Sequence, residues 1–318
     1  MRVTVVGAGI IGLTTAARLL ATGHDVRVVA AAPIEASTSH LAAAVWFPTH
    51  VGPADRVSEW GRRTYDVLAE QAARGIPGVV MRESLALHRE PPGRPDWAEA
   101  VRGVRAATAG DLPPGYRYGW RFVVPLVEMP VYLPWLAEQV RADGAEWHQR
   151  RIDSLTELAD DGVDAIVNCS GLGARDLVGD GSVYPVRGQI VRVTNPGLTM
   201  SVRDENHPAG RAYVHPRVHD CILGGTLDVG SWDTRVDLET SASILRRCRD
   251  IVPALAEATV IEHVVGLRPG RPVVCLEEDV VDDSGPRILH NYGHGGAGVT
   301  IGWGCAEEIS RLLGPGRP

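Results

Sequence analysis

The chain has 318 residues, of which 44% are hydrophobic, which is enough for about two globular domains with sizeable cores. Its formal net charge of −7, without a run of basic residues, argues against nucleic acid or an anionic membrane as a partner and favours small-molecule chemistry. No apolar stretch approaches the roughly 18 to 20 residues of a membrane span, and no basic leader precedes the first motif, so we expect a cytoplasmic protein.

The chain begins with a pattern typical of dinucleotide binding. Residues 2–6 form an apolar strand that leads into Gly7-x-Gly9-x-x-Gly12, an apolar-periodic helix follows to Leu20, and Asp25–Val29 is a second strand. Gly7 permits the tight turn, Gly9 lets the backbone approach a pyrophosphate, and Gly12 lets helix and strand pack closely. The helix N-terminus offers unpaired N–H groups to the negative charge. We therefore expect residues 7–12 to bind a dinucleotide, namely Gly7, Ala8, Gly9, Ile10, Ile11 and Gly12.

One expected part of this motif is missing. A carboxylate about 20 residues after the glycines normally binds the ribose hydroxyls. Here residues 30–32 are all alanine. Either the ribose is bound by something else, such as backbone groups or Glu35, or it is bound loosely.

Later segments alternate in character. Residues 52–138 contain Pro/Gly-rich loops and a helical pattern around Trp60–Ala72, and Val163–Gly173 has the pattern of a buried parallel strand that breaks into a glycine-rich turn. Ile288–Gly298 predicts a strand and a glycine cluster, and the helix that follows to Leu313 would make this cluster a second backbone-donor nest. Three segments alternate like antiparallel strands: Val186–Val193, Arg211–Val218 and Cys221–Thr226.

These patterns predict an α/β fold in which a Rossmann-like dinucleotide domain is interleaved with a β-rich α+β substrate domain. We expect the first domain to comprise residues 1–51, 139–185 and 265–318, and the second to comprise residues 52–138 and 186–264. The five cysteines are widely spaced, so we expect buried free thiols and neither disulfides nor a metal site: Cys169, Cys221, Cys248, Cys275 and Cys305.

Seven ordered segments together resemble the D-amino acid oxidase family, in a bacterial-type member. They extend over nearly the whole chain: Gly7–Gly12, His40–Pro48, Val167–Gly173, Arg187–Ile190, Leu223–Thr226, Gly266–Pro272 and Asn291–Gly298. The resemblance implies FAD as cofactor and a D-amino acid and O2 as substrates. The implied products are a 2-oxo acid, ammonia and hydrogen peroxide, and a homodimer is compatible with it.

The resemblance also assigns the substrate-binding residues. Arg268 matches the arginine that binds the substrate carboxylate, for which a planar two-donor guanidinium is suited; from the sequence alone a structural ion pair is an equal alternative. Tyr213 matches the second partner of that carboxylate, although a tyrosine in a strand is more often a core residue. Gly296 matches the glycine whose carbonyl accepts a hydrogen bond from the substrate amine.

For the cofactor, the resemblance assigns three hydroxyl groups, at Ser37, Thr38 and Ser39, to the FAD phosphates or ribose, although these residues also fit an ordinary polar loop. The other implied cofactor contacts lie at the flavin, the adenine, the pyrophosphate and the last helix: Ala43, Ala44, Val45, Ile152, Ser170, Gly293, Gly295, Gly296, Gly298, Val299 and Thr300.

The implied mechanism requires no acid or base on the protein, because hydride leaves Cα directly. His215 and His294 lie nearest to the expected site, but a lone histidine is more often structural. The stretch His207–Arg211 is shorter than in vertebrate members and lacks their lid tyrosine, so the lid is absent or different.

Several alternatives for the substrate and for the activity stay open. Arg203 resembles an arginine of the D-aspartate oxidases, but Leu227 replaces their second one, so we favour neutral, fairly hydrophobic D-amino acids over acidic ones. Further alternatives are a glycine or sarcosine-type oxidase, a nicotinamide-dependent dehydrogenase and a non-catalytic flavoprotein.

Overall fold

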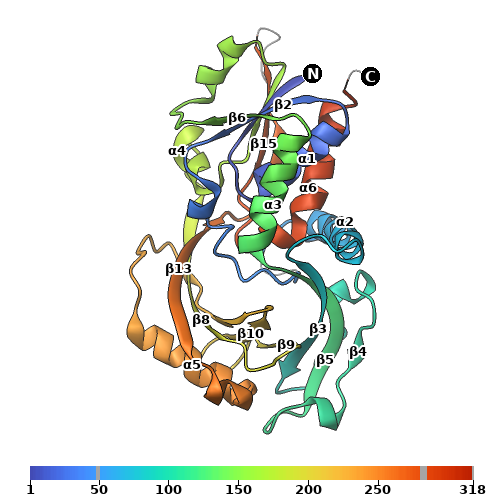
Figure 1. The fold of residues 1–318 in the computed structure, drawn as a ribbon, viewed down its shortest axis with the longest axis vertical. Coiled ribbons are helices and arrows are strands. Elements are labelled where there is room, and N and C mark those ends of the chain that lie inside the picture. The colour runs from blue at the N-terminus through green and yellow to red at the C-terminus, as the bar shows by residue number, and fades with distance from the viewer. Residues whose placement is uncertain (48–50, 280–284, 317–318) are drawn as a thin grey trace.

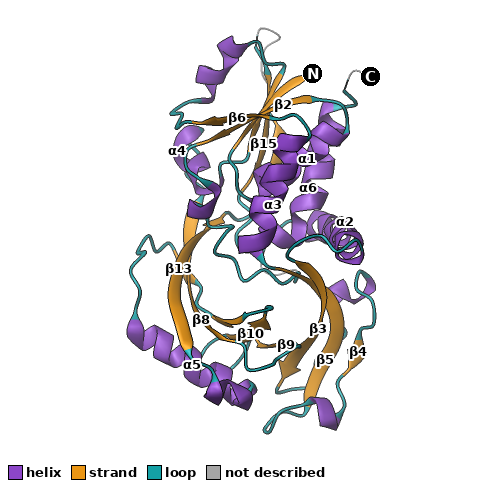
Figure 2. Ribbon diagram, viewed as in Figure 1, coloured by secondary structure: helices purple, strands orange, loops and turns teal. Residues whose placement is uncertain are grey.

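The computed structural model describes residues 1–47, 51–279 and 285–316. Two β-sheets lie at opposite ends of an elongated molecule, and most helices gather at the end that holds both chain termini (Figures 1 and 2). The predicted α/β fold class is confirmed. Pro48, the last residue of one family-like segment, lies outside the described residues.

The first sheet is the nucleotide-type sheet. Its six strands run in the order β14-β15-β7-β1-β2-β6, and every pairing in it is parallel except that of β14 with β15. The predicted strands after Met1, before the 169–173 turn and before the glycine cluster are its three central members. The strand bounds are β1 (Arg2–Val6), β2 (Asp25–Ala30), β6 (Glu146–Gln149), β7 (Ala165–Asn168), β14 (Cys275–Glu278) and β15 (Arg287–Tyr292).

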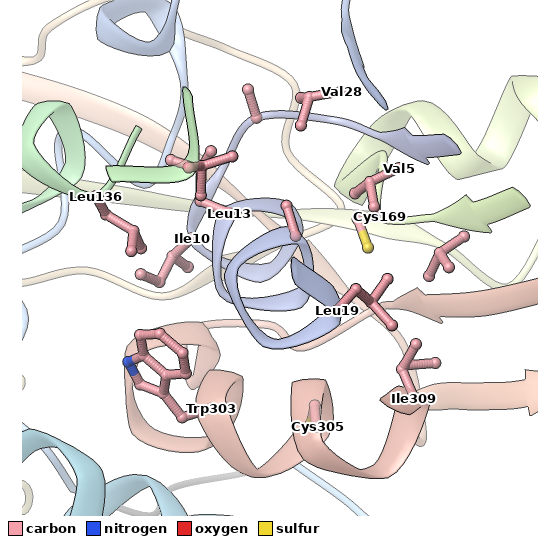
Figure 3. Packing of buried hydrophobic residues seen from close by; sticks show 14 of the residues in the cluster. Val5, Ile10, Leu13, Leu19, Val28, Leu136, Cys169, Trp303, Cys305 and Ile309 are labelled. Atoms are coloured by element: carbon pink, nitrogen blue, oxygen red, sulfur yellow. The ribbon is translucent and has the colours of Figure 1, made fainter. Parts of the chain in front are cut away.

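Four helices pack on this sheet or on one another. Helix α1 (Ile10–Ala21) lies against α6 (Gly298–Leu313) and α3 (Met129–Ala142), while α2 (Ala54–Ala73) lies against α6. Figure 3 shows α1 between strand residues such as Val5 and the α6 residues Trp303, Cys305 and Ile309. The buried apolar faces of α1, α3 and α6 thus form the core of this end of the molecule.

The glycines of the first motif act as predicted on the backbone. Gly7 has φ +109°, and a Cβ there would lie 2.5 Å from the carbonyl oxygen of Cys169. A Cβ at Gly12 would lie 1.9 Å from the carbonyl oxygen of Gly7. Only glycine lets β1, β7 and α1 meet this closely.

The second sheet has nine strands in the order β12-β8-β11-β10-β9-β3-β5-β4, with β13 also paired to β8. Helix α5 (Leu238–Ile251) covers the part formed by β8, β10 and β11, and buries Ile244 and Cys248 there. The strand bounds are β3 (Val79–His88), β4 (Arg105–Ala106), β5 (Tyr118–Val127), β8 (Tyr184–Thr194), β9 (Ser201–Asp204), β10 (Ala212–Pro216), β11 (Asp220–Gly224), β12 (Asp228–Val229) and β13 (Val260–Gly270). Helix α4 (Ala174–Leu177) and six 3-10 turns complete the elements: Ile34–Ala36, Asp96–Glu99, Ala109–Asp111, Leu155–Asp161, Gly171–Gly173 and Pro253–Glu257.

The chain crosses between the two ends more often than the sequence suggested. Helix α2 lies within residues 52–138, which we expected in the substrate domain, and helix α3 starts there. Both helices nevertheless share a hydrophobic core with β1, α1 and α6. The predicted domain limits stay a prediction, and this packing favours assigning both helices to the dinucleotide domain. All five cysteines are free and buried, as expected. Among the described residues, no helix combines the length and apolarity that a membrane crossing requires.

Candidate active site

One cavity of about 910 Å³ reaches from the C-terminal ends of β1, β2 and β7 to strands β8, β10 and β13 of the second sheet. This volume lies at the upper end of the range for small-molecule sites. The predicted cofactor residues that line it are Gly7, Ala8, Gly9, Ile10, Ile11, Ser37, Thr38, Ser39, Ala43, Ala44, Val45, Ile152, Ser170, Gly295, Gly296, Gly298, Val299 and Thr300.

Two predicted cofactor residues do not belong to the cavity wall. Gly12 packs against Gly7, so its function is in helix-to-strand packing. Gly293 has φ +81°, and a Cβ there would lie 2.8 Å from Cβ of Arg271. For these two residues contact with a cofactor stays a prediction, and what the structure shows is the close backbone packing that each of them permits.

The N-terminus of α1 opens into the cavity beside Ser39. The hydroxyl oxygen of Ser39 accepts a hydrogen bond of 3.0 Å from the backbone N–H of Ile10. A Cβ at Gly9 would lie 3.0 Å from the same hydroxyl oxygen, so a side chain at Gly9 would crowd it. The hydroxyl of Ser39 therefore lies where the helix dipole favours an anion.

The neighbouring hydroxyl groups have backbone partners. Ser37 donates to the carbonyl of Ile34 at 2.6 Å, which is a local turn. Thr38 donates to the carbonyl of Leu267 at 2.9 Å and so connects this loop to β13 next to Arg268. Contact of these two hydroxyl groups with FAD stays a prediction, and any such contact must use their oxygens as acceptors.

The segment expected beside the flavin has an unusual backbone. Ala44 has φ +52°, the left-handed region that non-glycine residues rarely occupy. Its carbonyl accepts from the N–H of Val127 at 2.8 Å, and the N–H of Trp46 donates to the carbonyl of Pro125 at 2.8 Å. These bonds fix residues 44–46 against β5 and hold the segment in the cavity wall.

The last helix presents a second N-terminus to the cavity. The N–H of Gly295 donates to the carbonyl of Pro269 at 2.7 Å, which ties the glycine loop to the residue after Arg268. Gly298 and Val299, in the first turn of α6, line the same cavity as the N-terminus of α1. Two helix dipoles therefore favour negative charge in one cavity.

At the predicted ribose end, the wall contains residues that the sequence did not suggest. Ala31 and Ala32 line the cavity, and beside the predicted residue Ile152 its neighbours Arg150, Arg151 and Asp153 line it as well. Strand β6 pairs in parallel with β2, so Arg150, Arg151 and Asp153 follow the end of β6 just where a carboxylate is missing after β2. Glu35 does not line the cavity. The parallel pairing could not be read from the sequence, because β6 is only four residues long and mostly polar.

At the other end of the cavity lies the Arg268 guanidinium. It extends over Gly188, where a Cβ would lie 2.2 Å from Nη1, and Nη1 donates to the carbonyl of Thr226 at 3.2 Å. Within residues 1–47, 51–279 and 285–316, no carboxylate lies within 4.0 Å of this guanidinium. A partly buried cation in this state is suited to bind an anionic ligand.

Tyr213 and Gly296 border the same space. The Tyr213 phenol lies over Gly224 and Gly225, where a Cβ would lie 2.2 Å and 2.6 Å from its oxygen. Burial raises the pKa of Tyr213, so its hydroxyl stays a donor at neutral pH. A Cβ at Gly296 would lie 3.2 Å from Cδ of Arg268, so this glycine contacts the arginine side chain.

A second arginine lies farther along the wall. Arg203 is buried, its Nη1 lies 3.8 Å from an oxygen of Glu205, and its guanidinium lies 3.8 Å from the centre of the Phe47 ring. Arg211 pairs with the same Glu205 at 3.2 Å and also lines the cavity. None of Glu205, Arg211 and Phe47 was assigned to the site from the sequence, although Phe47 lies within the family-like segment His40–Pro48.

The two histidines of the cavity wall are neutral. Burial lowers the pKa of His294 to about 3, and burial followed by the charge of Arg203 lowers the pKa of His215 well below its usual value. The His215 ring stacks on Tyr213 with 4.8 Å between the ring centres. Neither histidine is suited as a general base near pH 7 on these values, since each resists protonation.

Comparisons with known proteins identify the family of the chain. The family model described as FAD dependent oxidoreductase matches residues 2–312. A D-amino-acid oxidase of Rubrobacter xylanophilus is 50% identical over 98% of the chain and 96% of its own length, and human D-aspartate oxidase is 36% identical over 98% and 94%. The crystal structure of a glycine oxidase from Geobacillus kaustophilus has a TM-score of 0.78 at 22% identity, over 98% of this chain and 94% of that one.

Proposed function

The chain belongs to the family of FAD-dependent oxidoreductases, and from this membership we propose that it oxidises D-amino acids to 2-oxo acids and ammonia, with O2 as the electron acceptor and hydrogen peroxide as the second product. The observation that carries the proposal is the Arg268 guanidinium, which lies in the cavity without a carboxylate partner among the described residues. Identity of 50% to a D-amino-acid oxidase supports the substrate class. The cofactor of this family is FAD, so the family membership excludes the alternative of a nicotinamide-dependent dehydrogenase.

The cavity has the features that FAD requires. The small residues Gly7 and Gly9 let the backbone reach the ligand, and the N-termini of α1 and α6 supply N–H groups for the pyrophosphate and for the pyrimidine side of the flavin. We propose that residues 43–45 lie against the flavin ring and that residues 150–153 border the adenosine. When bound, FAD supplies the acceptor for a hydride and passes the electrons to oxygen.

The protein contributes mainly orientation. In this proposal Arg268 and the Tyr213 hydroxyl bind the substrate carboxylate, and the carbonyl of Gly296 accepts a hydrogen bond from the amine. These contacts fix two substituents of Cα, the carboxylate and the amine, so only one enantiomer has its hydrogen directed at the flavin, and in this proposal that enantiomer is the D form. The low pKa values of His215 and His294 agree with a reaction in which no side chain removes a proton from Cα.

Neutral, fairly hydrophobic side chains are the first candidate. The cavity wall includes the apolar residues Phe47, Leu227 and Val229 as well as Arg203 and Arg268. A second candidate is D-aspartate oxidation. Arg203 favours it, because the Arg203 guanidinium is 3.8 Å from the Glu205 carboxylate, too far for a hydrogen bond, and can therefore bind the side-chain carboxylate of a substrate. A D-aspartate rate that depends on Arg203 would select the second candidate.

Two coarser features complete the proposal. The five free, buried cysteines support a reducing compartment, which for this chain we propose is the cytoplasm. A homodimer is proposed on the family resemblance alone, and light scattering of the FAD-loaded protein tests it.

Anaerobic mixing tests the proposed function. The FAD-loaded protein should lose its visible flavin absorbance with D-alanine or D-phenylalanine and keep it with the L enantiomers. Admission of air should restore the absorbance and release one peroxide for each 2-oxo acid formed. A flavin that only L-amino acids, glycine or sarcosine reduce would overturn the proposal.

A further inference from the structure

Arg187 lies at the centre of a buried hydrogen-bond network behind the proposed carboxylate site. It is 6% exposed, on β8. Its guanidinium donates to the carbonyls of Asp233 at 2.8 Å and Arg235 at 2.7 Å, to the side chain of Gln189 at 2.9 Å, and to Oδ2 of Asp228 at 3.0 Å. Four acceptors around one cation fix the backbone that carries them.

Gln189 extends this network. It is fully buried, its side-chain amide donates to the carbonyl of Asp237 at 2.6 Å and to the hydroxyl of Ser241 at 2.7 Å, and its side-chain oxygen accepts from the N–H of Asp237 at 3.0 Å. Its own backbone N–H donates to the hydroxyl of Thr226 at 3.0 Å. Arg187 and Gln189 therefore hold residues 226–237, the anchored segment, along its whole length.

The anchored segment has little core of its own. Residues 228–236 are exposed or half-buried, and Val229 is 66% and Trp232 54% exposed. Hydrophobic packing therefore does not fix its position, and the bonds to β8 do.

The anchored segment in turn holds Arg268. Its first carbonyl, on Thr226, accepts from Nη1 of Arg268 at 3.2 Å, and Leu227 and Val229 line the cavity beside it. Gly188, the residue of β8 between Arg187 and Gln189, lies under the same guanidinium. Residues 187–189 thus contact Arg268 through Gly188, and they contact the anchored segment through the side chains of Arg187 and Gln189.

We propose that Arg187 is a positioning residue for carboxylate binding: through the anchored segment it fixes Thr226, and Thr226 fixes the Arg268 guanidinium over Gly188. The inference rests on the proposed function, since it assumes that Arg268 binds the substrate carboxylate. It gives a function to the Arg187–Ile190 segment, which none of the proposed contacts with substrate or FAD uses.

The test measures carboxylate binding apart from turnover. Benzoate carries a carboxylate and no oxidisable amine, and its binding to the FAD-loaded protein is followed by the change in the flavin spectrum. We expect Arg187→Gln to raise the benzoate Kd at least tenfold, and Arg187→Lys to raise it less, while the FAD Kd stays within twofold. The matched control is Arg192→Gln on the same strand, since Arg192 pairs with Asp220 and Glu262 outside the cavity and its variant should keep the wild-type benzoate Kd.

A double-mutant cycle separates positioning from general stability. In an Arg268→Ala background, Arg187→Gln should change kcat/KM for a D-amino acid less than twofold, because the group that it positions is gone. An unchanged benzoate Kd in both Arg187 variants, or effects of Arg187 and Arg268 that simply add, would overturn the inference. A different result would overturn the proposed function, namely a wild-type protein that binds benzoate but oxidises no D-amino acid.

Discussion

Arg268 is the residue on which the proposed chemistry depends most. A guanidinium beside a phenol, with no carboxylate partner within 4.0 Å in the described chain, is suited to bind a carboxylate through parallel hydrogen bonds, which is the role we propose for it. We predict that Arg268→Ala lowers kcat/KM for a D-amino acid by about 10²- to 10³-fold, or about 3 to 4 kcal/mol, because the substrate carboxylate is left unpaired. Steady-state kinetics on the FAD-loaded variant check this, and activity within tenfold of wild type would refute the assignment.

Gly188 tests the position of that guanidinium without removing it. A Cβ at Gly188 would lie 2.2 Å from Nη1 of Arg268, the mobile end of a long side chain. Gly188→Ala should therefore leave the fold intact, displace the guanidinium and raise KM at least tenfold. Gly181→Ala is the matched control, since nothing lies within 4 Å of its new methyl group. Equal KM values in the two variants would mean that Arg268 does not work from this position.

His294 gives a pH dependence with a defined sign. The pKa of His294 is about 3 in the folded state and about 6.5 in the unfolded state. Between these pH values the unfolded chain binds a proton at His294 and the folded chain does not. Stability is therefore fully present above about pH 6.5 and is lost progressively as the pH falls toward 3, by about 1 kcal/mol per pH unit.

Melting temperatures between about pH 4 and 6 check this. His294→Gln should show a shallower fall than wild type, and the control His148→Gln, on the exposed strand β6, should not. Parallel curves for His294→Gln and wild type would show that His294 does not contribute this proton uptake.

At the scale of elements, the close contact between α1 and its neighbours depends on small residues. A methyl group at Gly12 would meet the carbonyl of Gly7 at 1.9 Å, and backbone cannot move aside as a side chain can. We expect Gly12→Ala to lower the melting temperature by about 5 °C or more and to weaken FAD binding. Gly302→Ala in α6, whose methyl group would lie 3.4 Å or more from its neighbours, should be neutral or stabilising by up to about 1 kcal/mol. A Gly12→Ala protein as stable as wild type would contradict this.

The elements nearest to the glycine motifs were predictable from the sequence. Glycines 7, 9 and 12 follow an apolar strand and precede a periodic helix, so strand, turn and helix were all specified locally. Strands β3 and β5 and helix α3 were not predicted. Their partners lie far away in sequence, as β3 pairs with β5 and β9, and α3 carries Pro134 inside a helix.

The candidate site shows the same division. The first glycine cluster carries its own signal, so the turn at residues 7–12 was predictable, whereas Arg268 was assigned by the family resemblance and lies in the cavity wall. Arg150, Asp153 and Glu205 reach the cavity only through strand pairing and packing that no local pattern encodes. Gly12 and Gly293, two of the predicted cofactor residues, do not line the cavity, and their contact with FAD stays a prediction.

At the scale of the whole molecule, the two sheets have separate tasks. The six-stranded sheet directs strand ends and the N-terminus of α1 toward one end of the cavity, and the nine-stranded sheet supplies Arg268 and Tyr213 at the other end. The segment 37–39 and the loop 293–298 connect both ends, through Thr38 to Leu267 and Gly295 to Pro269. Loss of FAD should therefore also disturb the substrate end.

The measurement that tests the central claim most directly is peroxide release by the FAD-loaded protein with paired D- and L-amino acids, D-aspartate, glycine and sarcosine. The account predicts peroxide with neutral D-amino acids, a kcat/KM at least 10²-fold higher for D than for L enantiomers, and loss of this activity in Arg268→Ala. Peroxide formed equally from both enantiomers, or from none of these compounds by a protein that holds FAD, would contradict it.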